Sequence, residues 1–112
     1  MARVLVCDDE RHILRLVQVN LERQAHEVST CDNGVECLAR LRREPFDVLV
    51  VDGDLDSPST REVLDELEHE PEIHVRVIVL GDDPQDPKKP FGGSPPLVVS
   101  KPFKPAELLQ AL

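Results

Sequence analysis

The chain has 112 residues, of which 40% are hydrophobic and 31% are charged, a balance that is ordinary for one globular domain. Its formal net charge of −9, without a basic stripe, argues against a nucleic-acid partner. No signal peptide and no apolar run of about 18 residues is present, so we expect a soluble, cytoplasmic protein that does not bind membranes.

The hydrophobic pattern predicts strands and helices in strict alternation. Short runs rich in Val and Leu are typical of strands buried on both faces of a parallel sheet. The predicted strands cover residues 3–7, 26–31, 48–52, 75–80 and 97–100. Helical spacing and capping signals predict helices over 11–23, 34–43, 59–70 and 105–112. The sequence therefore predicts an α/β fold, doubly wound around a five-stranded parallel sheet.

The segment 81–96 breaks this alternation. It holds five of the ten prolines and three of the five glycines of the chain. Each proline in a helix interior removes a hydrogen-bond donor and clashes with the preceding turn, at a cost of about 3 kcal/mol. We therefore expect a Pro/Gly-rich loop in place of the fourth helix. The loop is either a variation without a role or a rebuilt contact surface.

Charged residues stand where three of the hydrophobic runs end. Asp8 and Asp9 follow the first run, Asp52 ends the third, and Lys101 follows the last. These groups should converge, because the site of an open parallel sheet lies at the carboxyl ends of its strands. Three clustered carboxylates require a cation, for which Mg²⁺ is suited, or one of them must keep its proton. With Lys101 as a partner for an anion, the pattern indicates a phosphoryl-transfer site.

These segments resemble the receiver domain of the bacterial response regulators. The matching segments are 4–10, 32–34, 46–52 and 100–103. Their order and spacing fit the family from residue 3 to the end, apart from 81–96. The resemblance implies one receiver domain over 1–112, with the flavodoxin-like strand order 2-1-3-4-5. It also implies a member of a two-component phosphorelay that acts by regulated protein contact, on an output partner that the sequence does not name.

The resemblance implies a role for each charged residue. Asp52 is the expected phosphoacceptor, which takes phosphate from a histidine kinase or a phosphotransfer protein. Asp9, Asp52 and the backbone carbonyl of Asp54 are expected to bind Mg²⁺ directly, and Asp8 through water. Lys101 is expected to offset charge on the phosphoryl oxygens. The chain is not expected to be an enzyme beyond its own phosphorylation and dephosphorylation.

Three of the positions that depart from the family pattern lie at the switch. Gly81 replaces a Ser or Thr whose hydroxyl binds a phosphoryl oxygen, and Asp82 replaces a small residue with a further negative charge. Val98 replaces the aromatic side chain that reports the phosphorylated state. We therefore expect an atypical receiver, in which phosphorylation is impaired or switching is altered.

Two other functions stay open. One is a pseudo-receiver, an interaction module that ignores phosphate. The other is a phosphatase similar to the haloacid dehalogenases, with Asp52 as nucleophile and Asp54 as acid/base. That second alternative lacks the usual threonine after the Asp-x-Asp pair and the usual cap, and it leaves Asp8 and Asp9 unexplained.

The loss of a helix would also uncover apolar surface on the fourth and fifth strands. We therefore expect docking of a partner, or a homodimer, near Phe91 and the last helix. The sequence stops eight residues into that helix and leaves open whether the chain is the amino-terminal part of a longer protein.

The three cysteines, Cys7, Cys31 and Cys37, lack a metal-ligand spacing in the sequence. Free, buried thiols in a reducing compartment are the expectation for them.

Overall fold

Five parallel strands form one sheet in the order β2-β1-β3-β4-β5. In the computed structural model, described for residues 1–81, 97–99 and 104–112, the strands are β1 (Arg3–Cys7), β2 (Glu27–Cys31), β3 (Val48–Asp52), β4 (Arg76–Leu80) and β5 (Leu97–Val99). This confirms the strand order implied by the resemblance. The loop predicted over 81–96 lies outside the described residues except for Gly81, and so do Asp82 and Lys101.

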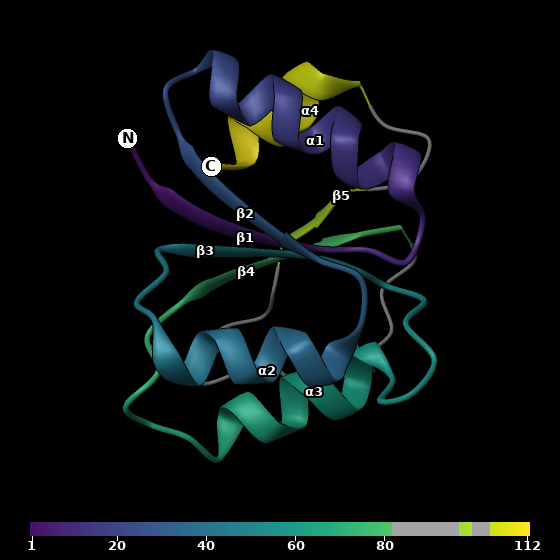
Figure 1. The fold of residues 1–112 in the computed structure, drawn as a ribbon, viewed down its shortest axis with the longest axis vertical. Helices are drawn as coiled ribbons and strands as arrows, with labels where there is room; N and C mark the ends of the chain where they lie inside the picture. The colour runs from purple at the N-terminus through teal and green to yellow at the C-terminus, as the bar shows by residue number, and fades with distance from the viewer. Residues whose placement is uncertain (82–96, 100–103) are drawn as a thin grey trace.

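Helices cover both faces of the sheet (Figure 1). The described helices are α1 (Arg11–Arg23), α2 (Gly34–Arg43), α3 (Thr60–Glu68) and α4 (Pro105–Ala111). In the view of Figure 1, α1 and α4 lie above the sheet and α2 and α3 lie below it. The doubly wound architecture is therefore confirmed, with helix and strand ends within one or two residues of the predicted ones. Among the described residues, no helix is long and apolar enough to cross a membrane.

Alternating side chains of the strands build two separate cores. Val4 and Val6 face the core under α1 and α4, whereas Leu5 and Cys7 face the core under α2 and α3. All five residues of β3 are buried, because both of its faces are covered and it has a neighbour on each side. Continuous apolar runs arise for this reason, and they were the signal that predicted the parallel sheet.

Local side chains fix where α2 and α3 begin. The Asn33 side chain accepts a hydrogen bond from the backbone N–H of Glu36 at 2.8 Å, and Ser59 and Glu62 form the predicted capping box. The two helices approach closely at Gly34, where an added Cβ would lie 2.7 Å from the Cγ of Pro58. A glycine at this position therefore allows α2 to pack against the segment that leads into α3.

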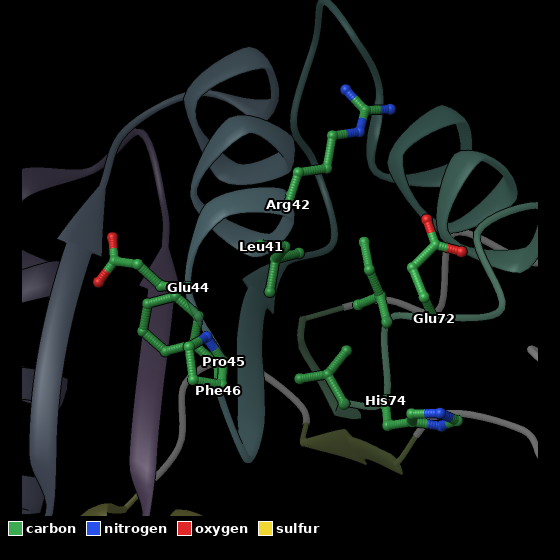
Figure 2. Close-up of a pocket in the computed structure, with 9 residues that line it drawn as sticks. Leu41, Arg42, Glu44, Pro45, Phe46, Glu72 and His74 are labelled. Carbon is green, nitrogen blue, oxygen red and sulfur yellow. The ribbon is translucent and has the colours of Figure 1, made fainter.

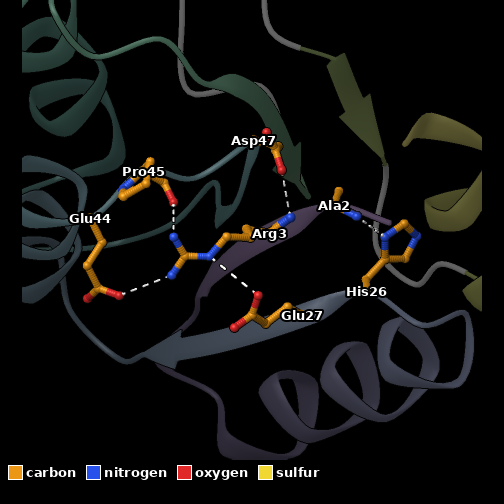
Figure 3. Close-up of polar contacts among 7 residues, drawn as sticks. All are labelled: Ala2, Arg3, His26, Glu27, Glu44, Pro45 and Asp47. Atoms are coloured by element: carbon orange, nitrogen blue, oxygen red, sulfur yellow. Dashed lines mark hydrogen bonds and ion pairs between the residues drawn. The ribbon is translucent and has the colours of Figure 1, made fainter.

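Arg3 ties three strands together at their amino ends (Figure 3). Its guanidinium donates to the carbonyl of Pro45 at 2.8 Å and lies 3.5 Å from the Glu27 carboxylate, while its backbone N–H donates to Asp47 at 2.8 Å. Figure 2 shows a surface pocket of about 330 Å³ at the same end, between the carboxyl end of α2 and the segments that lead into β3 and β4. The candidate site lies at the other end of the strands.

Candidate metal centre

Four carboxylates meet at the carboxyl ends of β1 and β3. One oxygen each of Asp8, Asp9, Glu10 and Asp52 lies within 4.8 Å of the others. The register of β1 and β3 explains why the carboxylates meet. Cys7 and Val51 are paired neighbours, and the residue that follows each of them is an aspartate. The structure therefore brings Asp8, Asp9 and Asp52 together, as predicted. Glu10, to which the sequence analysis gave no role, joins them.

Backbone N–H groups hold the two buried carboxylates in place. Asp8 and Asp52 are buried, whereas Asp9 and Glu10 are exposed. The N–H of Glu10 donates to Oδ1 of Asp8 at 2.9 Å, and the N–H of Asp54 donates to Oδ1 of Asp52 at 3.2 Å. Each bond runs from two residues farther along the chain, so each strand end folds into a turn around its own aspartate. The site is thus organised by its loops before any ligand binds.

The electrostatics of the cluster favour a cation. Desolvation raises the pKa of Asp9 above its ordinary value, and the side-chain hydrogen bond and the charge of Asp52 raise it further. Carboxylates at this distance are relieved by a shared proton or by a bound cation. A set of clustered carboxylate oxygens is the donor chemistry that Mg²⁺ prefers. The chain therefore presents a candidate magnesium centre that is accessible from the side of Asp9.

The loop between β3 and α3 is fixed from inside by Thr60. The Thr60 hydroxyl donates to the backbone carbonyl of Asp52 at 2.5 Å and accepts from the backbone N–H of Leu55 at 3.1 Å. Thr60 is buried, as is Leu55. The hydroxyl thereby closes the turn that contains Asp54, whose carbonyl is one of the expected metal ligands.

Replacing Thr60 by valine should lower the free energy of unfolding by about 1–3 kcal/mol, because it leaves a buried N–H and a buried carbonyl without their partner. Urea denaturation followed by circular dichroism measures this loss. Thr60→Ser is the matched control, since it keeps the hydroxyl, and it should retain most of the stability. A loss in Thr60→Val no larger than that in Thr60→Ser would show that the two hydrogen bonds of the hydroxyl contribute no more to stability than the methyl group does.

Of the described switch positions, Gly81 directly follows β4 and Val98 lies on β5. The N–H of Gly81 donates to the carbonyl of Val99 at 2.8 Å, and that of Gly53 donates to Leu80 at 2.8 Å, so Gly81 borders the turn that follows Asp52. The backbone of Gly81 has φ 99°, a conformation that side chains rarely adopt. Val98 is 40% exposed on β5. At this position the chain thus offers a bare backbone instead of a hydroxyl.

The structure also shows a cluster that the sequence analysis missed. The thiols of Cys7, Cys31 and Cys37 are free and buried, as expected, but their sulfur atoms also lie within 4.8 Å of one another. Hydrogen bonds from Cys37 and Cys7 lower the pKa of Cys31, and the hydrogen bond to Cys31 raises the pKa of each of the other two thiols. The only sequence signal was that Cys7 and Cys31 both end strands that the fold places side by side.

Comparison with known proteins supports the same family over almost the whole chain. The family model for the response regulator receiver domain matches residues 4–112. The heme response regulator HssR of Staphylococcus epidermidis is 28% identical over 109 residues, which is 97% of this chain and 49% of that protein. The alkaline phosphatase synthesis regulatory protein PhoP of Bacillus subtilis is 42% identical over 50 residues, 45% of this chain and 21% of that protein. The chain thus spans half or less of the length of these relatives.

Solved structures show the same architecture. The chemotaxis response regulator CheY4 of Vibrio cholerae superposes with a TM-score of 0.83 at 27% identity, covering 100% of this chain and 99% of that one. The response regulator TrrA of Thermotoga maritima, solved in complex with Mg²⁺ and beryllium fluoride, has a TM-score of 0.82 at 26% identity, covering 98% and 95%. The fold, the acidic cluster at the strand ends and the family match agree, and the chain belongs to the response regulator receiver domains, the signalling modules of two-component systems.

Proposed function

We propose that this receiver domain accepts phosphate on Asp52 with the help of Mg²⁺. The observation that carries the proposal is the convergence of the carboxylates of Asp8, Asp9 and Asp52, with Asp52 at the end of the central strand β3. A histidine kinase or a phosphotransfer protein is the proposed donor. We place the domain in the cytoplasm, a reducing compartment in which its three cysteines would stay free thiols.

Each residue of the site has a distinct task in this proposal. Asp9, Asp52 and the carbonyl of Asp54 would hold Mg²⁺ directly, and buried Asp8 would hold it through water. When bound, the ion offsets the charge of the phosphoryl oxygens. The Asp54 N–H fixes Oδ1 of Asp52 at 3.2 Å and so orients the carboxylate for an in-line attack by its other oxygen. Lys101, outside the described residues, is assigned its role by the family resemblance alone.

The proposed domain switches in an altered way. A phosphoryl group on Asp52 would find no side-chain donor at Gly81, only a backbone turn with φ 99°. Val98 has no aromatic ring whose rotation could signal the phosphorylated state. A second function, an interaction module that does not depend on phosphate, is favoured by the same two observations. The phosphatase alternative has no support left, because the receiver family accounts for residues 4–112, including Asp8 and Asp9.

Titration with Mg²⁺ and beryllofluoride, followed by NMR, tests the proposed phosphoacceptor. Mg²⁺ alone should shift the amides at 8–10 and 52–54. Beryllofluoride, which replaces the phosphoryl group, should add further shifts there and at 81 only when Mg²⁺ is present. Asp52→Asn should show no beryllofluoride-dependent shifts. If Mg²⁺ alone gives all the shifts in the wild-type chain, the chain has a metal site without a phosphoacceptor, and the interaction module is the better function.

For the partner surface, we propose self-association through the edge of the sheet at β5. Leu97 and Val98 are 46% and 40% exposed on this edge strand. An edge strand with exposed apolar side chains can pair with another chain. Phe91, near which we expected this contact, lies outside the described residues.

Sedimentation velocity at increasing concentration should detect the dimer, and Val98→Lys should weaken it because a charge on an edge strand opposes pairing. Leu16→Lys is the matched control, since Leu16 is also 40% exposed but lies on α1. A wild-type chain that stays monomeric at high concentration would rule out this interface.

A further inference from the structure

The cysteine cluster lies beside the acidic site but offers different chemistry. The sulfur atoms of Cys7, Cys31 and Cys37 lie within 4.8 Å of one another, and all three residues are buried. The two clusters share the carboxyl end of β1, where Cys7 is followed directly by Asp8 and Asp9. Their ligands nevertheless belong to different classes, hard oxygen in one and soft sulfur in the other.

Three elements of the fold bring the thiols together. Cys7 and Cys31 are direct partners in the register of β1 and β2, and Cys37 lies on α2, which packs over this face of the sheet in the same core. The Cys7 thiol donates to the backbone carbonyl of Asn33 at 3.4 Å, just before α2 begins. The arrangement therefore rests on the main fold and not on an exposed loop.

The spacing of the sulfur atoms is close to that of a three-thiolate metal site. With metal–sulfur bonds of about 2.3 Å, three sulfur atoms around a trigonal ion lie about 4.0 Å apart. The sulfur atoms here lie at most 4.8 Å apart, so side-chain movements of less than about 1 Å would bring them to that distance. Thiolates select soft ions such as Cu⁺ and Zn²⁺ and do not select Mg²⁺.

One residue of the cluster, Cys31, borders a surface pocket of about 350 Å³. The pocket is also lined by Thr30 and Asp32, the chain neighbours of Cys31, and by residues of α1 and α2. Cys31 is also the least buried of the three cysteines, at 4% exposure. The edge strand β2 is therefore the side of the cluster that lies nearest the surface.

We propose that Cys7, Cys31 and Cys37 bind one thiophilic d¹⁰ metal ion, Cu⁺ or Zn²⁺, in a three-thiolate site. Binding replaces the thiol protons, which leave to solvent, by three metal–sulfur bonds, and no oxidant or reductant is needed. The ion would crosslink β1, β2 and α2.

The test uses the full chain, reduced and kept free of oxygen. Cu⁺ is titrated from a competing chelator, and Zn²⁺ is titrated separately with excess Mg²⁺ present to occupy the carboxylates. We expect one ion per chain for at least one of the two metals, and slower alkylation of all three thiols than in the metal-free chain under the same conditions. For Cu⁺, we also expect charge-transfer absorption in the near ultraviolet. Whichever of the two metals meets these criteria is assigned to the site.

Variants separate the thiol site from the acidic site. Cys31→Ser should weaken binding by more than about 100-fold, because even partners outside the ligand set contribute 10- to 100-fold to metal affinity. Asp9→Asn, in the acidic cluster, should leave binding unchanged. Absence of binding for both metals, or protection of only two thiols in the wild-type chain, would overturn the proposal. The alkylation experiment needs no variant, so it decides even if Cys31→Ser does not fold.

Discussion

Replacing Asp52 by asparagine is expected to abolish the labelling of this chain by acetyl phosphate in the presence of Mg²⁺. An amide has no anionic oxygen to attack phosphorus, and the other carboxylates of the cluster are assigned to the metal. Intact-protein mass spectrometry measures the phosphorylated fraction. Asp54→Asn is the matched control, because Asp54 is exposed two residues farther on and contributes only its backbone in the proposed site. Labelling that persists in Asp52→Asn would show that another residue is the acceptor.

The wild-type chain should be labelled more slowly than a receiver that carries a hydroxyl at the position of Gly81. Restoring the hydroxyl with threonine is not a clean test, because the φ of 99° at Gly81 strains any side chain, a β-branched one most of all. The pair Gly81→Ser and Gly81→Ala separates the two effects. Both carry the strain of a Cβ, and only serine supplies a donor, so serine should give the higher phosphorylated fraction. Equal fractions would show that the missing hydroxyl does not limit the reaction.

The sequence predicted the fold well because its signals are local. Val48–Asp52 forms a continuous apolar run that ends in an aspartate, and such a run is found where a strand is covered on both faces. The capping box at Ser59 located the start of α3. Asp8 and Asp52 each stand at the carboxyl end of a predicted strand. Because parallel strands end at the same edge of the sheet, the sequence also predicted that these two residues lie close together.

The features that the sequence did not predict depend on distances between elements. The thiol cluster required Cys37 to face β1 and β2, and no spacing along the chain contains that information. The role of Thr60 required the turn after Asp52 to close over its hydroxyl. At Gly81, the sequence showed a missing side chain, whereas the positive φ appears only in the folded backbone.

Magnesium is expected to stabilise the chain, and Asp9→Asn is expected to remove that effect. By mass action, Mg²⁺ at 100 times its dissociation constant adds about 2.7 kcal/mol to the free energy of unfolding. The melting temperature in millimolar Mg²⁺, compared with that in chelator, measures this gain. Asp65→Asn, which changes the same charge on α3 outside the cluster, is the control and should keep the full response to Mg²⁺. A melting temperature that does not respond to Mg²⁺ in the wild-type chain would exclude a metal site at these carboxylates.

In metal-free buffer, Asp9→Asn should stabilise the chain and melt at a higher temperature than the wild type. The pKa of Asp9 is raised in the fold by desolvation and by Asp52, so the folded state binds the proton more tightly than the unfolded state does. The stability that Asp9 contributes is therefore present at low pH and is lost as the pH rises through the raised pKa. At neutral pH the wild type carries this repulsion and the asparagine variant does not. The difference between the two melting temperatures should shrink as the pH is lowered toward the ordinary pKa of an aspartate, and a difference that stays constant with pH would assign the gain to something other than the charge of Asp9.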